Sequence, residues 1–143
     1  MKFTTIAAAT LAFALPTFAQ SQQSVTYDNT YDDSAFSLDG VACSDGVNGL
    51  ISKGYTTLGS LPDFPYVGGA SAVTSWDSPA CGTCWQLTWS TNDVTINVLA
   101  VDHCAEGFNI SEEAFNALTG GLAYELGNIT VTATQVNASV CGL

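Results

Sequence analysis

The chain has 143 residues, 47% of them hydrophobic, which suffices for one domain with a core but not for two domains of ordinary size. Thirteen acidic residues against two basic ones give a formal net charge of -11 at pH 7. Nucleic acids and anionic membranes attract proteins through clusters of Lys and Arg, so this composition excludes both as partners. Polyanions are repelled as well, and a polymeric partner is therefore expected to be neutral or cationic.

Residues 1–19 have the pattern of a secretory signal peptide. Lys2 supplies a positive charge, residues 6–15 are largely apolar, and small residues at 17 and 19 suit a signal peptidase. The apolar run is shorter than the roughly 20 residues of a membrane span, and no later stretch is long enough. We expect cleavage after Ala19, no transmembrane segment and a secreted domain over residues 20–143, whose cysteines meet oxidising conditions.

The first half of that domain predicts one strand, one short helix and a long loop. Residues 24–27 are rich in β-branched and aromatic side chains, as an opening strand is. Ser44-Asp45 indicates a helix cap, followed by a short helix that ends near Gly54. Residues 58–69 contain prolines and paired glycines, which favour loop and turn over a central strand.

Three further segments predict strands. Residues 85–89 alternate, so Trp85 and Trp89 share one face and are expected in the core. Residues 94–101 have the strongest strand pattern and are apolar on both faces in their second half, as in a strand of a closed barrel. Residues 129–136 alternate apolar residues with threonine at first and are expected to close the barrel.

The best-formed helix is predicted after Ser111. This serine can cap the helix, two glutamates lie in the first turn, and Gly120-Gly121 provides the stop. No repeat or linker interrupts the chain. The sequence therefore predicts one mainly β domain, a small barrel with short helices.

Five cysteines remain after residue 19, an odd number for a secreted protein. The Cys81-Gly82-Thr83-Cys84 stretch has the spacing of a zinc knuckle or a redox motif, but a second close pair is missing and the chain has one histidine. We therefore predict two structural disulfides that reach from this pair to distant partners, no metal site and no cofactor. Cys104 is the candidate for the unpaired thiol.

Several stretches are individually specific: CSDGVNGLI, FPYVGG, SPACGTCWQLTW, TINVLAVDH, GFNI, NALTGG and TATQV with the later CGL. In this order, and over nearly all of residues 25–143, they closely resemble the cerato-platanin family of small secreted fungal proteins. The resemblance implies a six-stranded double-psi β-barrel, like that of expansins and of one endoglucanase family. It also implies disulfides Cys43–Cys81 and Cys84–Cys141, whereas Cys104 stands where the family usually has a small residue.

The family resemblance further implies a function. It implies binding of chitin oligomers, expansin-like loosening of cellulose without hydrolysis, surface activity and elicitation of plant defence. A location outside the cell or in the fungal cell wall follows from the same resemblance. Asp102 matches the family's aspartate that is needed for loosening.

The residues themselves offer the two devices that hold sugars, flat apolar rings and planar polar groups. Tyr27-Asp28 and Tyr31-Asp32-Asp33 place rings beside carboxylates, and Asp102-His103 directly follows the longest strand. Asp45 also fits a helix cap, and His103 also fits a hydrogen bond to the backbone. The predicted carbohydrate-binding residues are Asp102, His103, Asn109, Tyr27, Asp28, Asp45, Asn48 and Trp76.

Two alternative functions remain open at this stage. A related glycoside hydrolase would use Asp102 as its acid, but inverting hydrolysis needs a second carboxylate, and the first strand does not reproduce the enzyme motif around Asp28. A surface-active coat protein that self-assembles at interfaces would expose Trp76, Phe64 and Tyr66 as a patch.

Three Asn-x-Ser/Thr sequons begin at Asn109, Asn128 and Asn137. A glycan on Asn109 would crowd the predicted binding groove. We therefore expect Asn109 to be unmodified, and Asn128 or Asn137 to be the acceptor.

Overall fold

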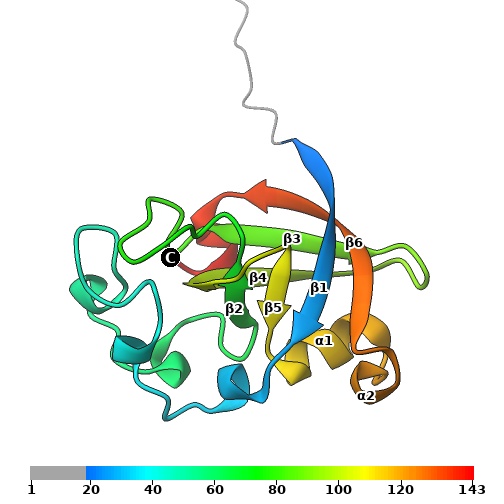
Figure 1. The fold of residues 1–143 in the computed structure, drawn as a ribbon, viewed down its shortest axis with the longest axis horizontal. Coiled ribbons are helices and arrows are strands. Elements are labelled where there is room, and N and C mark those ends of the chain that lie inside the picture. The colour runs from blue at the N-terminus through cyan, green and yellow to red at the C-terminus, as the bar shows by residue number, and fades with distance from the viewer. Residues whose placement is uncertain (1–18) are drawn as a thin grey trace, which may run out of the picture.

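The structure is a computed structural model that describes residues 19–143. Six strands form a closed barrel in the order β1-β5-β2-β4-β3-β6 (Figure 1). Their bounds are β1 (Gln20–Tyr27), β2 (Val67–Ala70), β3 (Cys84–Trp89), β4 (Val94–His103), β5 (Phe108–Ile110) and β6 (Asn128–Val136). The pairs β1–β5 and β2–β4 are parallel and the other four are antiparallel. This closed barrel confirms the predicted fold class; the predicted signal peptide lies outside the described residues, apart from Ala19.

The interior of the barrel is filled by the apolar faces that the sequence pattern indicated. Residues 98–101 of β4 are all buried, and Leu87 of β3 is fully buried. Trp85 and Trp89 are half-buried against this core, and the Trp85 ring lies 5.4 Å from that of Phe108. The prediction that both tryptophans belong to the core is confirmed only in part, because both pack against the core without being buried in it.

Two α-helices accompany the barrel, α1 (Glu112–Thr119) and α2 (Ala123–Leu126). As predicted, the Ser111 hydroxyl caps α1 by accepting from the Ala114 N–H at 3.0 Å, and Gly120 ends the helix. The sequence did not indicate α2, which is a single turn. None of the helices within residues 19–143 has the length and apolar character to cross a membrane.

The prediction of a helix after Ser44-Asp45 is wrong. Residues 44–48 form bends, and the first regular element is a 3₁₀ turn, η3 (Ile51–Lys53), which ends at Gly54. The segment forms a loop, and a hydrogen bond between its two ends closes this loop: the Leu50 N–H donates to the Cys43 carbonyl at 2.9 Å. A helix there would need hydrogen bonds between residues four apart.

The prediction that residues 58–69 are only loop is also wrong. The first part is a 3₁₀ turn, η4 (Leu58–Ser60), but residues 67–69 lie in β2, a buried strand between β4 and β5. The prolines at 62 and 65 both precede the strand and leave its ladder intact.

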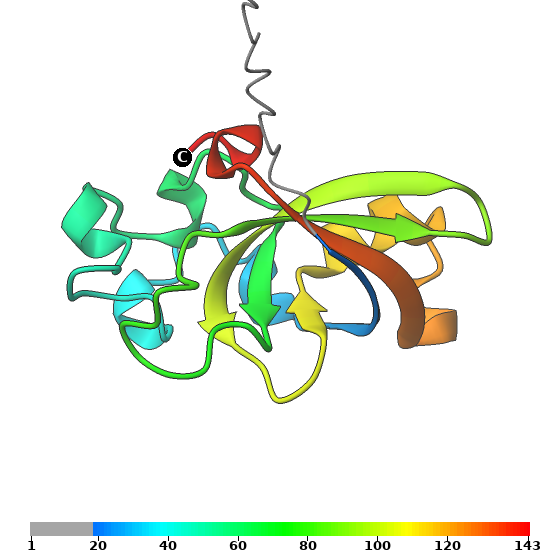
Figure 2. The same cartoon turned by 90° about the horizontal axis from the view of Figure 1, so that it is seen from above.

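The long connections gather on one side of the barrel, while α2 lies on the other side (Figures 1 and 2). Residues 28–66 link β1 to β2, and residues 71–83 link β2 to β3. The Cys43–Cys81 disulfide joins these two connections, and Cys84–Cys141 ties β3 to the last 3₁₀ turn, η5 (Ala138–Cys141). Both pairs agree with those that the family resemblance implies.

Candidate functional site

Asp102 lies near the end of β4 and anchors the connections that cover this end of the barrel. Its Oδ1 accepts hydrogen bonds from the backbone N–H groups of Ala42 and His103, both at 2.8 Å, and its Oδ2 accepts from the Tyr31 hydroxyl at 3.0 Å. Burial, followed by the charge and hydrogen bond of Asp102, raises the pKa of the Tyr31 hydroxyl, so that Tyr31 remains a donor. Sequence reasoning did not identify this bond, because the two residues are 71 positions apart.

The donors around Asp102 define what its carboxyl group can do. All three present a hydrogen to the carboxyl oxygens, which therefore act as acceptors. A general acid in glycoside cleavage must instead carry a proton and deliver it to the leaving oxygen. The geometry suits a residue that fixes the surrounding backbone.

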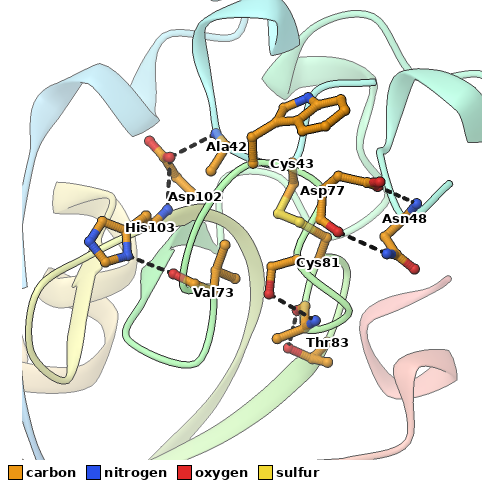
Figure 3. Close-up of a disulfide and its surroundings, with 12 residues drawn as sticks. Ala42, Cys43, Asn48, Val73, Asp77, Cys81, Thr83, Asp102 and His103 are labelled. Atoms are coloured by element: carbon orange, nitrogen blue, oxygen red, sulfur yellow. Dashed lines mark hydrogen bonds between the residues drawn. A yellow bond between two sulfur atoms is a disulfide. The ribbon is translucent and has the colours of Figure 1, made fainter. Parts of the chain in front are cut away.

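From Asp102 a hydrogen-bond network runs through Ala42 into the loop of residues 71–83 (Figure 3). The Ala42 carbonyl accepts from the Asp77 N–H at 3.3 Å. The Asp77 carboxylate in turn accepts from the Asn48 N–H at 2.8 Å, and the Asp77 carbonyl accepts from the Asn48 side-chain amide at 2.9 Å. Figure 3 shows the Cys43–Cys81 disulfide between the Asp102–Ala42 hydrogen bond and the Asp77–Asn48 hydrogen bonds. Asn48 thus bonds a neighbouring loop, and Asp77 is a site residue that the sequence did not single out.

Trp76 is held at the surface beside this network. Its side chain is 58% exposed, and its indole N–H donates to the Asp45 carboxylate at 2.8 Å. Asp45 is therefore the partner of an exposed aromatic ring, and the helix-cap interpretation of Asp45 is wrong. The hydrogen bond fixes the orientation of the ring and leaves much of its surface open to solvent.

Four neighbouring strands bring together a row of register partners, here called the polar row: Thr26, Asn109, Gly69 and Asp102. Thr26, Asn109 and Asp102 are half-buried, whereas Gly69 is buried beneath Cys104. Asn109 of β5 is the register partner of both Thr26 on β1 and Gly69 on β2, and Gly69 also pairs with Asp102 on β4. The Thr26 hydroxyl donates to the Asn109 side-chain oxygen at 3.0 Å. Phe108 and Ile110, on either side of Asn109, are buried, so the side chain of Asn109 points out of the barrel.

The remaining predicted binding residues have structural partners. The exposed His103 ring has its Nδ1 2.6 Å from the Val73 carbonyl, and since a carbonyl only accepts, Nδ1 is the donor. The half-buried Tyr27 ring packs 5.3 Å from that of Phe115. Asp28 is exposed and caps the 3₁₀ turn η1 (Asn29–Asp32), accepting from the Thr30 N–H at 2.8 Å. Tyr27 thus contributes to packing, and Asp28 to the turn that follows β1.

Three further features complete the surroundings. Cys104 is unpaired and half-buried, and burial raises the pKa of its thiol. Phe64 and Tyr66, predicted as exposed rings, are half-buried against the core, because the turn that carries them leads directly into β2. Within residues 19–143 the surface has no enclosed pocket, and no three His, Cys, Asp or Glu side chains gather as metal ligands would. The candidate site is therefore not a cavity: it consists of Trp76 with Asp45, the hydrogen-bond network around Asp102 and the Thr26–Asn109 pair.

Comparison with known proteins gives one consistent result. The Cerato-platanin family model matches residues 23–143. The "Heat-stable 19 kDa antigen" of Coccidioides immitis (strain RS) is 46% identical over 147 aligned residues, which cover 100% of this chain and 99% of the antigen. The crystal structure of cerato-platanin 3 from M. perniciosa has a TM-score of 0.83 and 48% identity, covering 86% of this chain and 100% of that chain. The solution structure of the fungal elicitor Cerato-Platanin has a TM-score of 0.74 and 41% identity, covering 82% and 95% of the two chains.

Proposed function

This chain belongs to the cerato-platanin family of secreted fungal proteins, and on that premise we propose that it binds neutral glycans, chitin oligomers above all, without cleaving them. The relatives are named as antigens, allergens and an elicitor. The binding site we propose consists of Trp76 with Asp45 and the polar row. In this proposal the flat ring of Trp76 and the polar side chains of the row together contact the sugar, and the polar side chains form hydrogen bonds with its hydroxyl groups.

The observation that carries this proposal is the fixed, exposed ring of Trp76. An exposed aromatic ring usually rotates freely, whereas this indole is held by the Asp45 carboxylate at 2.8 Å. A flat apolar ring of fixed orientation suits the apolar face of a pyranose, and it loses little conformational entropy when the sugar binds. No basic side chain is needed for such contact, which agrees with a chain whose net charge is -11.

The polar row extends the surface beyond Trp76. The row crosses four neighbouring strands, from Thr26 on β1 through Asn109 on β5 and Gly69 on β2 to Asp102 on β4. Gly69 is buried in the middle of the row, and the half-buried Cys104 packs against it. A site that is not a cavity admits a polymer along its length, whereas a closed pocket admits only chain ends or small molecules.

We propose binding without hydrolysis because Asp102 is committed to its three donors. Asp28, the candidate second carboxylate, accepts from the Thr30 N–H. Because both oxygens of Asp102 accept hydrogen bonds, this carboxyl group is not arranged to donate a proton to a leaving oxygen. Reducing-sugar release from chitin or cellulose oligomers, abolished by Asp102→Asn, would favour the hydrolase alternative over the proposal.

The proposal is tested by titrating the protein with a chitin hexasaccharide while following tryptophan fluorescence. Trp76→Ala should weaken binding by about tenfold or more, equivalent to about 1.4 kcal/mol. Asp45→Ala should weaken it less, because the ring remains but is no longer fixed. Tyr124→Ala is the matched control, since Tyr124 is also an exposed ring, 90% exposed, but lies on α2. Equal affinity of the Trp76→Ala variant and the wild type would refute the proposed site.

A surface-active coat is the second candidate function. Large apolar side chains are exposed on several segments, among them Val47 at 89% and Val140 at 50%. Exposed apolar surface lowers the free energy of a protein at an interface. Surface-tension measurements with and without chitin oligomers separate the two functions, because interfacial activity without a fluorescence response to sugar would favour the coat. Elicitation of plant defence is a further proposal for the secreted protein, since one solved relative is the fungal elicitor Cerato-Platanin.

A further inference from the structure

We propose that Asn128 carries an N-linked glycan that stands at the β6 end of the polar row and limits the length of the glycan ligand that the row accepts. The effect on ligand length rests on the proposed function, whereas the modification itself does not.

The three sequons differ sharply in the folded protein. Asn109 is half-buried in the barrel wall, its side-chain oxygen accepts from Thr26, and the sequon hydroxyl of Ser111 is fully buried as the cap of α1. A glycan on Asn109 would stand in the middle of the polar row. The side-chain oxygen of Asn137 already accepts from the Ser139 N–H at the start of η5.

Asn128 has none of these restraints. It is the exposed first residue of β6, Ile129 turns into the core with 7% exposure, and Thr130 is exposed again. The acceptor amide and the sequon hydroxyl therefore face outward on the same side of the strand, as the alternation of a strand requires. Because the Asn128 side chain is exposed, an attached sugar extends into solvent and does not have to enter the fold.

The strand register places Asn128 in line with the polar row. Thr26 pairs with Asn109 on one side and with Asn128 on the other. Residues directly opposite in an antiparallel pair project to the same face, with Cβ atoms about 5 Å apart. Asn128 is thus the next position after Thr26, and a group attached there stands where a ligand longer than the row would continue.

The modification is a balanced group transfer in the secretory pathway. The Asn128 amide nitrogen forms a bond to C1 of an N-acetylglucosamine, and the bond from C1 to the diphosphate of a polyprenyl-diphosphate oligosaccharide donor breaks. The amide proton passes to the released lipid diphosphate. The attached sugars are bulky and hydrated, so they exclude a second glycan chain from the same space.

The experiment uses the full protein secreted by a fungal host, with peptide mass spectrometry before and after enzymatic deglycosylation. The peptide that contains Asn128 should carry the glycan, and Asn128→Gln should abolish it, whereas Asn109→Gln should leave the total glycan mass unchanged. An unmodified Asn128 would overturn the proposal whatever the protein binds.

The second measurement compares the affinity of glycosylated wild type and of Asn128→Gln for chitin oligomers of increasing length. The variant should bind the hexasaccharide several-fold more tightly and the disaccharide equally well. Asn137→Gln is the matched control and should change neither affinity. Equal affinities at every length, with binding intact, would overturn the placement at the end of the row. Failure of both forms to bind any oligomer would refute the proposed function and with it the effect on ligand length, while the mass measurement would still decide the modification.

Discussion

Asp102 holds two connections to the barrel through a single carboxylate, and its replacements separate structural from functional roles. In Asp102→Asn the remaining oxygen still accepts from the Ala42 and His103 N–H groups, and the new amide can donate to the Tyr31 hydroxyl oxygen. We expect a melting temperature near that of the wild type but weaker loosening of filter paper, the activity that the family resemblance implies for Asp102. Undiminished loosening by this variant would contradict a functional role for Asp102.

Asp102→Ala is the contrasting substitution. It leaves the N–H groups of Ala42 and His103 without an acceptor, and each unsatisfied group costs about 1–3 kcal/mol when buried. Since these groups are only partly buried, we expect a loss of about 2 kcal/mol in unfolding free energy, measured by denaturant titration. An alanine variant as stable as the asparagine variant would show that the network does not support the fold.

Asp63, in the turn before β2, makes the unfolding free energy of the protein depend on pH. Its Oδ2 is buried without a hydrogen-bond partner among the described residues, and burial raises its pKa from 3.8 to about 7. Between these two values the folded protein keeps the proton while the unfolded chain loses it. The contribution of Asp63 to stability is therefore complete below pH 4, falls as the pH rises toward 7 and is then constant.

Asp63→Asn removes this titration and keeps the shape of the side chain. Relative to the wild type, the variant should gain unfolding free energy as the pH rises from about 4 to about 7. Asp93→Asn is the control, because Asp93 is exposed and its φ of 56° is one that asparagine tolerates. Thermal melts across this pH range measure the effect, and parallel curves for Asp63→Asn and the wild type would contradict it.

At the scale of elements, the sequence predicts those strands and helices whose own residues carry a periodic pattern or a cap. β3, β4, β6 and α1 were predicted because alternation or a cap with a glycine stop is present in the segment itself. β2 and β5 were missed because each has four residues or fewer and is specified by its neighbours in the barrel. The same limit applies to the site: the exposure of Trp76 was predicted, whereas the Tyr31–Asp102 and Asn48–Asp77 bonds join residues far apart in sequence.

Gly68 shows how such a strand is specified without a hydrophobic pattern. A Cβ at this position would lie 2.4 Å from the Asn109 carbonyl oxygen and 2.7 Å from the Ile110 Cα, both backbone atoms. The glycine permits β2 and β5 to approach closely at the point where the register of β2 against β4 shifts.

Gly68→Ala should therefore be strongly destabilising, by about 3 kcal/mol or more, because backbone on the adjoining strand has to move. Gly54→Ala is the control: its φ is 99° and nothing lies within 4 Å of the added Cβ, so only the cost of the backbone conformation, about 1 kcal/mol, is expected. Denaturant unfolding of both variants measures the difference. Similar losses would mean that the barrel wall relaxes around Cβ at residue 68.

At the scale of the whole molecule, the net charge of -11 separates specific glycan binding from ionic adsorption. If the protein binds through Trp76 and the polar row, affinity for a neutral N-acetylated chitin oligomer should not change between low salt and about 0.5 M salt, since no charge on the ligand is screened. The deacetylated oligomer of the same length is cationic, and its binding should weaken steeply over the same range. Calorimetric titration of this matched ligand pair measures both trends. Loss of the neutral oligomer's affinity with salt would mean that long-range charge, and not the fixed ring and the row, governs binding.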